Sequence, residues 1–245
     1  TDVTILEDRL YTRISGGSNR KNPLSRPLLL DGSESYDPDS FGGNNNKKMN
    51  YIWSCYHDGK EINNMGNYTE SIIVLHSNTF SANGSYRFCL NIWKYGMVNI
   101  REDSACINVE YTRELYPNIQ IKPLAKDKYN QDEKITLISS SYSYIGEPLE
   151  YKWELLGGTI NRDDINTPVT SINLVIKPDK LIAGRLYQFR LNGRDSIGPG
   201  FSQVDLVINT PPRGGMFNVN PVVGTALNTS FILLLNGWTD DADDL

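Results

Sequence analysis

The sequence predicts an all-β protein that consists of two tandem β-sandwiches and the beginning of a third. The first observation is a Tyr-x-Trp pattern that occurs twice, at 51–53 and at 151–153. The second is that a glycine and an alternating aromatic strand follow each copy, at 84–90 and at 184–191. The two copies lie about a hundred residues apart, close to the usual size of a β-sandwich domain. Self-similarity at this spacing indicates tandem domains.

The repeat divides the 245 residues into three predicted units, 1–112, 113–210 and 211–245, of which the last is incomplete. Length alone allows one or two domains, so the repeat decides the division. The junction at 110–117 is short, which predicts that the first two units stack end to end with restricted freedom. The sequence begins without Met and stops shortly after an expected strand, so we expect it to be an excerpt of a longer polypeptide.

The first unit shows short runs in which apolar and polar residues alternate with period two, as in half-buried strands. Gly, Asn, Ser and Pro separate these runs, and no segment carries a helical pattern. The stretch 42–48 is polar and is expected to be a loop. Strands are expected at 26–30, 51–55, 70–75, 84–93 and 104–111.

The second unit repeats this plan, and the strand that ends near 192 is expected to pair with the strand that begins near 204. Its expected strands are 119–121, 134–138, 151–154, 173–176, 186–192 and 204–208. In the third unit, the apolar run 231–235 has the length of a buried strand.

Two tryptophans, Trp53 and Trp153, are expected to face inward and to anchor one core each, because each would cover a large apolar area between two sheets. Tyr86 follows Gly84 at the start of a strand, the position at which a sandwich tyrosine bonds the backbone upstream. The core residues predicted from these patterns are Trp53, Tyr86, Phe88, Trp153, Tyr187 and Phe189.

The three cysteines are Cys55, Cys89 and Cys106. Alternation places Cys89 and Cys106 opposite the apolar faces of their strands, so a hairpin would bring both thiols to the same outer face. A disulfide between these two residues is one interpretation, and three reduced thiols are the other. Cys55 would then be unpaired, or paired with a residue outside this sequence.

Three acceptor sequons for N-linked glycans begin at Asn67, Asn83 and Asn228. Asn is common in this sequence, so chance alone could produce them. Together with a disulfide, however, sequons in expected loops favour a secreted protein or an ectodomain.

Composition argues against nucleic acid as a partner, because the net charge is -5 and no basic stripe is present. No apolar run reaches the roughly 18 residues that a membrane-spanning helix needs, so any membrane contact is expected through segments outside this sequence. The expected partners are other proteins or other domains of the same chain.

An enzyme is not expected. The two histidines are His57 and His76, and the pairing of Cys55 with His57 is the one arrangement that resembles a nucleophile and its base. Residues two apart on a strand share a face, so contact between them is feasible. No orienting acid or oxyanion hole accompanies the pair, and the glycine-rich stretches lack the Lys-Ser/Thr of a phosphate loop.

No cofactor is expected, although clustered aspartates leave calcium open. Asp31, Asp37 and Asp39 fall in one segment, and carboxylates in loops can bind calcium through hard oxygen ligands. The alternative is that these residues cap turns, and neither cluster has the spacing of an EF-hand. The second cluster consists of Asp240, Asp241, Asp243 and Asp244.

Two stretches carry a family resemblance. Residues 28–39, followed by Tyr51-x-Trp53-x-Cys55, are similar to the polycystic kidney disease (PKD) domain. Residues 211–240 resemble the receptor for egg jelly (REJ) pattern, which usually has cysteines where Met216 stands and near Leu235. The resemblance implies tandem immunoglobulin-like sandwiches of the PKD or fibronectin III type. It also implies the extracellular region of a polycystin-like membrane protein at a cell, gamete or ciliary surface.

Three functions follow as hypotheses. The chain could be a non-catalytic extracellular segment of such a membrane protein that serves adhesion, ligand binding or mechanical coupling. It could instead be a structural spacer in an extracellular filament or surface coat, such as a mastigoneme. A third hypothesis is an accessory domain of a secreted enzyme. Sequence beyond residue 245 would distinguish them by showing membrane spans, further repeats or a catalytic domain.

Overall fold

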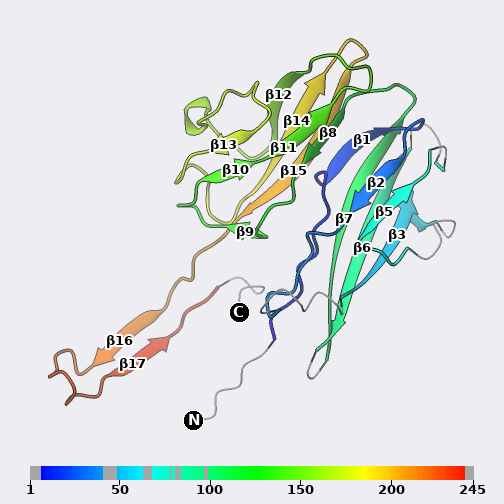
Figure 1. The fold of residues 1–245 in the computed structure, drawn as a ribbon. Helices are drawn as coiled ribbons and strands as arrows, with labels where there is room; N and C mark the ends of the chain where they lie inside the picture. Colours follow the sequence, from blue (N-terminus) through cyan, green and yellow to red (C-terminus); the bar gives the residue numbers. More distant parts are fainter. Residues whose placement is uncertain are drawn as a thin grey trace.

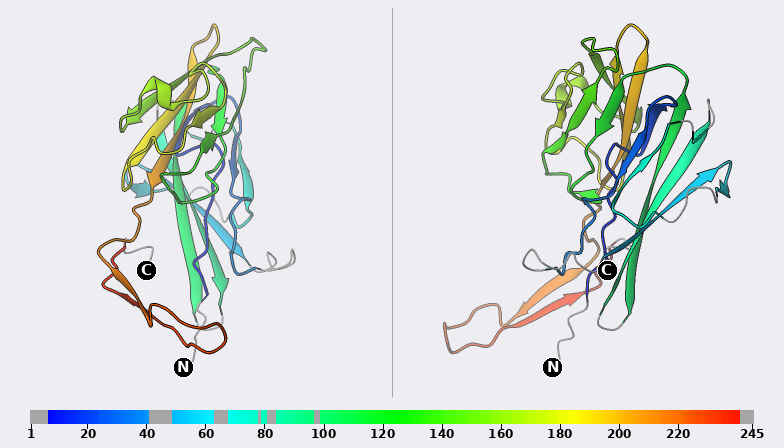
Figure 2. Two further views of the ribbon diagram at one scale, coloured as in Figure 1. Left: turned by 90° about the vertical axis from the view of Figure 1, so that its left-hand side faces the viewer. Right: turned by 45° about the vertical axis from the view of Figure 1, so that its right-hand side comes forward.

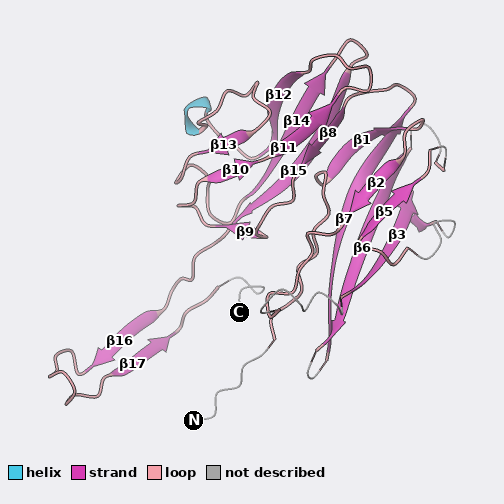
Figure 3. Cartoon of the chain, in the orientation of Figure 1, coloured by secondary structure: helices cyan, strands magenta, loops and turns pink. Residues whose placement is uncertain are grey.

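The computed structural model describes residues 7–40, 49–62, 68–77, 79–80, 84–96 and 99–240. The described chain is built from strands, with one short 3₁₀ turn at Arg162–Asp164, and it confirms the predicted all-β class (Figures 1 and 3). Two separate clusters of buried apolar residues form two cores, and they fall inside the first two predicted units. The boundaries at residues 112 and 210 stay a prediction. Within the described residues, no helix is both long enough and apolar enough to cross a bilayer.

The first unit packs a large sheet against a small one. The large sheet has the order β7-β6-β3-β4, and the small sheet pairs β2 with β5. Their bounds are β2 (Leu28–Asp31), β3 (Asn50–His57), β4 (Lys60–Glu61), β5 (Ile72–Leu75), β6 (Ser85–Tyr95) and β7 (Ile100–Thr112). Leu30, Trp53, Phe88 and Val109 are buried between the two sheets, as the alternation of apolar residues predicts.

The second unit places one sheet, β12-β14-β15, against two short pairs, β8–β11 and β10–β13. The predicted pairing of 186–192 with 204–208 is confirmed by β14 and β15. The bounds are β8 (Asn118–Ile121), β9 (Lys128–Tyr129), β10 (Ile135–Leu137), β11 (Ser139–Tyr142), β12 (Glu150–Gly157), β13 (Leu174–Ile176), β14 (Leu186–Arg194) and β15 (Pro199–Ile208).

A strand that the sequence did not predict joins the two units. Strand β1 (Asn19–Pro23) pairs in parallel with β7 and antiparallel with β15, so one nine-stranded sheet runs through both sandwiches. The expectation of end-to-end stacking is therefore wrong: the units lie side by side (Figure 1). Strand β7 takes up the first residues of the predicted junction, and the remaining residues, 113–117, turn the chain back beside the first unit. Strand β1 lies between β7 and β15.

Both cores lie on the same side of this shared sheet. Arg20 is in register with Val109 of β7 and with Ser202 of β15, so these three side chains point to one side. Val109 belongs to the first core, and Ser202 alternates in phase with the core residue Leu206. The other side is mainly polar, although Ile52, Trp93 and Phe201 also lie on it; this side is called the polar face. One cross-strand row on it reads Glu154, Arg190, Gln203, Asn19, Asn108, Arg87 and Tyr56.

The third segment is a two-stranded hairpin of β16 (Met216–Asn220) and β17 (Ile232–Asn236). It projects away from both sandwiches (Figure 2). The apolar run at 231–235 does form a strand, but the expectation that it is buried is wrong, because Leu233 is 61% and Leu235 is 65% exposed. Among the residues that the structure describes, no second sheet covers this hairpin.

Candidate functional sites

Trp53 is the anchor of the first core and is 3% exposed. Its indole N–H donates to the carbonyl of Glu70 at 3.0 Å, and its backbone N–H donates to the carbonyl of Tyr68 at 3.1 Å. Strand β3 therefore packs a large apolar side chain and also binds the segment that passes over its outer edge. The indole keeps a hydrogen-bond partner although it is buried, as a tryptophan in a core requires.

Trp153 repeats this arrangement in the second unit and is 5% exposed. Its indole N–H donates to the carbonyl of Ser171 at 3.0 Å, and its backbone N–H donates to the carbonyl of Val169 at 2.8 Å. The internal repeat that the Tyr-x-Trp pattern indicated thus extends to the hydrogen bonds. In each unit the tryptophan closes the outer edge of its sheet with a loop, which leaves few free strand groups for unwanted pairing.

The aromatic residues at the start of β6 and β14 are buried as predicted. Tyr187 is completely buried, and its hydroxyl accepts a hydrogen bond from the backbone N–H of Ile182 at 2.9 Å. The sequence predicts a bond of this kind for Tyr86, and Tyr187 makes it at the corresponding position of the second unit. In the first unit Tyr86 packs edge-on against Tyr111, with ring centroids 5.5 Å apart, and Phe88 is completely buried.

The disulfide expected from alternation is present. Cys89 and Cys106 lie directly opposite each other in the β6–β7 register and are bonded. They lie on the polar face of the shared sheet, beside Ser54 of β3, in the floor of a depression of about 520 Å³. Cys55 is the remaining free thiol and is buried in the first core.

The pairing of Cys55 with His57 has no catalytic geometry. Burial raises the pKa of the Cys55 thiol to about 12, so no reactive thiolate forms near neutral pH. The His57 ring stacks on Tyr86 with centroids 4.4 Å apart, and its Nδ1 lies 3.0 Å from the carbonyl oxygen of Ser85. The His57 ring therefore packs flat against Tyr86 at the end of the sheet.

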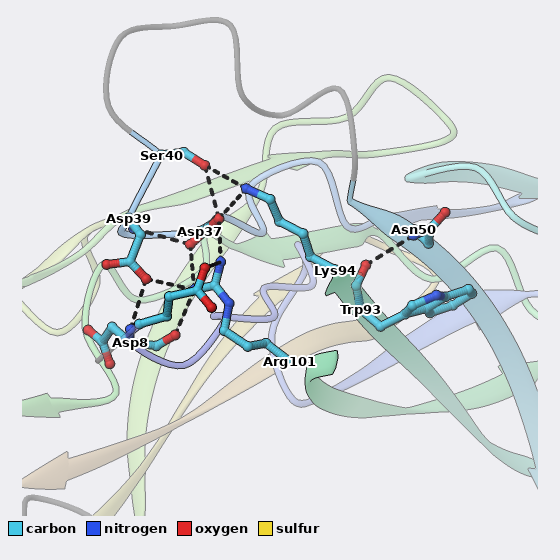
Figure 4. Close-up of polar contacts among 9 residues, drawn as sticks. Asp8, Asp37, Asp39, Ser40, Asn50, Trp93, Lys94 and Arg101 are labelled. Carbon is cyan, nitrogen blue, oxygen red and sulfur yellow. Dashed lines mark hydrogen bonds and ion pairs between the residues drawn. The ribbon is translucent and has the colours of Figure 1, made fainter. Parts of the chain in front are cut away.

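The acidic segment of the first unit binds two cationic side chains (Figure 4). Lys94 and Arg101 lie directly opposite each other in the β6–β7 register, where like charges repel. Asp37 binds both: Lys94 Nζ donates to its carboxylate, and Arg101 forms a bidentate pair at 2.9 and 3.0 Å. Arg101 also donates to Asp39 at 2.7 Å.

These contacts bear on the calcium hypothesis. The carboxylates of Asp37 and Asp39 already face Lys94 and Arg101, which supply the positive charge that a cation would bring. Asp31 instead accepts hydrogen bonds from the backbone N–H and the hydroxyl of Ser33, as a turn cap does. Within the described residues, no three acidic, His or Cys side chains gather as metal ligands. Of the C-terminal cluster, Asp241, Asp243 and Asp244 lie outside the described residues.

Acid is expected to weaken this network. Burial alone would raise the pKa of Asp37, but hydrogen bonds from Lys94 and Arg101 outweigh it and lower the pKa to about 2. A carboxylate whose pKa is depressed on folding stabilises the protein above its unfolded pKa near 4, and this contribution is lost as pH falls toward 2. The loss is about 2 kcal/mol.

Denaturant unfolding of Asp37→Asn between pH 2 and 5 tests this expectation. The free energy of unfolding of the variant should depend less steeply on pH than that of the natural chain, and an equal slope would contradict the assignment. Asp58→Asn is the control, because its side chain is 88% exposed.

The sequons give one described site. Asn228 is exposed in the turn between β16 and β17, where its backbone N–H donates to the carbonyl of Thr225 at 3.1 Å. Asn67 and Asn83 lie outside the described residues. Use of all three sequons stays a prediction.

One buried residue, Arg20, was not indicated by the sequence. Arg20 is 2% exposed and has no carboxylate partner among its described bonds; its guanidinium donates to the carbonyls of Leu29 at 2.8 Å and Ser15 at 3.2 Å. Desolvation lowers its pKa to about 10. A buried arginine in a polar stretch gives no periodic signal, so only the pairing of β1 could have revealed it.

Comparison with known proteins identifies the chain's relatives. The family model of the REJ domain matches residues 1–245. Polycystin-1 from Homo sapiens is 26% identical over 260 residues, which cover 99% of this chain and 6% of that protein. The chain therefore spans about 6% of the length of this curated relative.

Solved structures show weaker likeness. Drosophila N-cadherin EC1-4 matches with a TM-score of 0.39 and 13% identity, over 88% of this chain and 54% of that one. The N-terminal eight Ig domains of Down Syndrome Cell Adhesion Molecule match with a TM-score of 0.34 and 16% identity, over 83% and 24%. These scores are low, so the all-β assignment rests on the strands and the two buried cores of this chain.

Proposed function

The chain belongs to the REJ domain family, and from this we propose that it is a non-catalytic extracellular segment of a larger polycystin-like membrane protein. REJ domains lie in the extracellular regions of polycystin-1-like proteins. The match of the family model to the whole chain is the observation that carries the proposal. The segment would serve adhesion, ligand binding or mechanical coupling at a cell or ciliary surface.

The chemistry of the chain supports this role. A disulfide between Cys89 and Cys106 suits an oxidising extracellular environment. The single free thiol, Cys55, is buried and unreactive, so the Cys–His pair provides no nucleophile. The polar face of the shared sheet offers hydroxyl, amide and charged groups to a protein partner, and a polar surface of this kind suits a non-obligate contact.

The extracellular assignment has a direct test. An epitope inserted at Gly146, an exposed turn glycine with open space around it, should leave both cores intact. In cells that express the whole protein, antibody is expected to label this epitope without permeabilisation. Labelling that requires permeabilisation would contradict the proposal. A cytoplasmic tag on the same protein serves as the permeabilisation control.

We also propose that the hairpin β16–β17 begins a third sandwich. Its register places Phe217 opposite Leu235 and Val219 opposite Leu233, which makes one face entirely apolar. In the second unit the first strand pair, β8–β11, likewise carries its apolar residues on one face, and there the opposing sheet buries Ile119. An exposed apolar face of this kind marks a site of further packing. The cover would be a sheet of the same polypeptide.

Hydrogen exchange tests the state of this hairpin. In the chain of residues 1–245, amides of β16 and β17 should exchange much faster than those of β14 and β15, because an isolated two-stranded hairpin is marginally stable. In a longer protein that includes the covering sheet, the same amides should become protected. Equal protection of the hairpin and the sandwiches in the short chain would contradict the proposal.

A further inference from the structure

The contacts between the two sandwiches converge on one segment, residues 9–26. Its central part is β1, which is in register with β7 over five residue pairs and with β15 over two. The backbone N–H of Ser18 donates to the carbonyl of Gln203 at 2.7 Å, and the carbonyl of Ser18 accepts from Asn108 at 2.9 Å. A single residue thus joins strands of both units.

Two glycines allow the segment to approach the strands of the second unit closely. Gly16 has a φ of +101°, its N–H donates to the carbonyl of Ile121 at 3.1 Å, and its own carbonyl accepts the Ser202 hydroxyl at 2.8 Å. Gly17 has a φ of +82°, and a Cβ placed there would lie 2.3 Å from the Gln203 carbonyl oxygen. A side chain at position 17 would therefore push β1 away from β15.

Both ends of the segment are also fastened to the second unit. At one end Arg9 and Arg13 form ion pairs with Asp127. At the other end Arg26 lies over the Tyr144 ring at 5.1 Å. Between the two ends, Lys21 of β1 lies over the Tyr116 ring at 4.4 Å and donates to the Pro199 carbonyl at 3.3 Å.

The same segment is anchored in the first unit. Leu10 and Ile14 are buried in the first core, and Arg20 donates to the carbonyl of Leu29 on β2 at 2.8 Å. Two nitrogens of the buried guanidinium donate to carbonyls, whereas its Nε has no partner, and moving the group would leave a buried cation without these two bonds. Displacing the segment from either sandwich is therefore costly.

We infer that residues 9–26 form a strap that locks the two sandwiches into one rigid body. The strap supplies a strand to the shared sheet, and the polar face on its far side becomes one presentation surface instead of two that move independently. The inference goes beyond the proposed function, because it concerns how the sandwiches are coupled and holds for any partner that the chain binds.

Spin-label distance measurements test the strap on the full chain of residues 1–245. Labels at Lys60→Cys and Thr136→Cys lie on exposed positions of β4 and β10, one in each unit. Cys55 is buried with a raised pKa, so it stays unlabelled. The natural strap should give one narrow distance distribution, and Gly17→Ala should broaden it and remove the hydrogen-exchange protection of the Ser18 amide.

The control is Gly146→Ala, which places alanine at a similar positive φ of +77° with no atom within 4 Å of the new Cβ. It should leave the distribution narrow. If Gly17→Ala does not fold, Asp127→Ala serves instead, because it removes the carboxylate shared by Arg9 and Arg13 and lies away from both cores. A broad distribution in the natural chain would overturn the strap. A narrow distance distribution in Gly17→Ala, or in Asp127→Ala where that variant is used, would also overturn it.

Discussion

Replacing Trp53 with alanine is expected to remove about 3–5 kcal/mol of stability and to unfold the first sandwich. The side chain is 3% exposed and lies opposite Leu90 in the β3–β6 register, so its loss leaves a large cavity between the two sheets. The substitution also leaves the carbonyl of Glu70 without the indole donor. Total stabilities of single domains are about 5–15 kcal/mol, so this loss is decisive.

Denaturant unfolding of the full chain, followed by circular dichroism, measures this effect. Trp53→Phe is the matched control, because it keeps most of the apolar volume and removes the indole hydrogen bond. A core substitution that conserves volume usually costs little stability. Trp53→Phe is expected to lower the free energy of unfolding by about 1–2 kcal/mol more than such a substitution, because the indole hydrogen bond is lost. Trp153→Ala should behave like Trp53→Ala, since the two anchors make the same pair of hydrogen bonds. Cooperative unfolding of Trp53→Ala with the stability of the natural chain would refute the role of the anchor.

Removing the disulfide with the double substitution Cys89→Ala and Cys106→Ala is expected to cost about 3 kcal/mol. The bond closes a loop between residues 17 apart in sequence, and loop closure of this length stabilises by restricting the unfolded chain. The two cysteines also hold β6 and β7 together on the polar face, away from either core.

Thermal unfolding with and without reductant separates this effect from a packing defect. The natural chain should lose stability when reduced, whereas the double variant should melt at the same temperature in both conditions. Cys55→Ala is the control, and reductant should still destabilise it, because its disulfide is intact. A natural chain whose melting does not respond to complete reduction would contradict the account.

Much of the fold could be predicted from the sequence, because the core strands of the two units follow the same alternating pattern. Alternation placed Trp53, Phe88 and Tyr187 inward and Cys89 outward, and each position agrees with the structure. These residues interact with partners on strands of the same unit, so local periodicity is sufficient to orient them. The prediction of a disulfide depended on the same parity argument.

The arrangement of the two sandwiches could not be predicted in the same way. Strand β1 reads Asn-Arg-Lys-Asn-Pro and has no apolar alternation, because neighbouring strands and backbone carbonyls provide its partners. The short junction at 113–117 is compatible with end-to-end stacking and with a turn back. Only the non-local pairing of Arg20 with β7 and β15 distinguishes the two arrangements.

The acidic segment shows a similar limit. Clustered aspartates in the sequence suggested calcium, but the partners of Asp37 are Lys94 and Arg101, more than fifty residues away. The hairpin register that sets these two cations opposite each other is the signal that could have identified them. The hairpin β16–β17 is a third case, since its apolar pattern predicts a strand but cannot show whether a second sheet covers it.

The central claim is that one strand joins two tryptophan-anchored sandwiches into a single sheet. Nuclear Overhauser effects of the Arg20 protons, measured by nuclear magnetic resonance, test this claim most directly. The register predicts that backbone protons of Arg20 lie close to those of Val109 on β7 and, at the same time, to those of Ser202 on β15. Both sets of nuclear Overhauser effects are expected in the folded chain. Contacts to Val109 without any to Ser202 would show that the sandwiches are separate and would contradict the account.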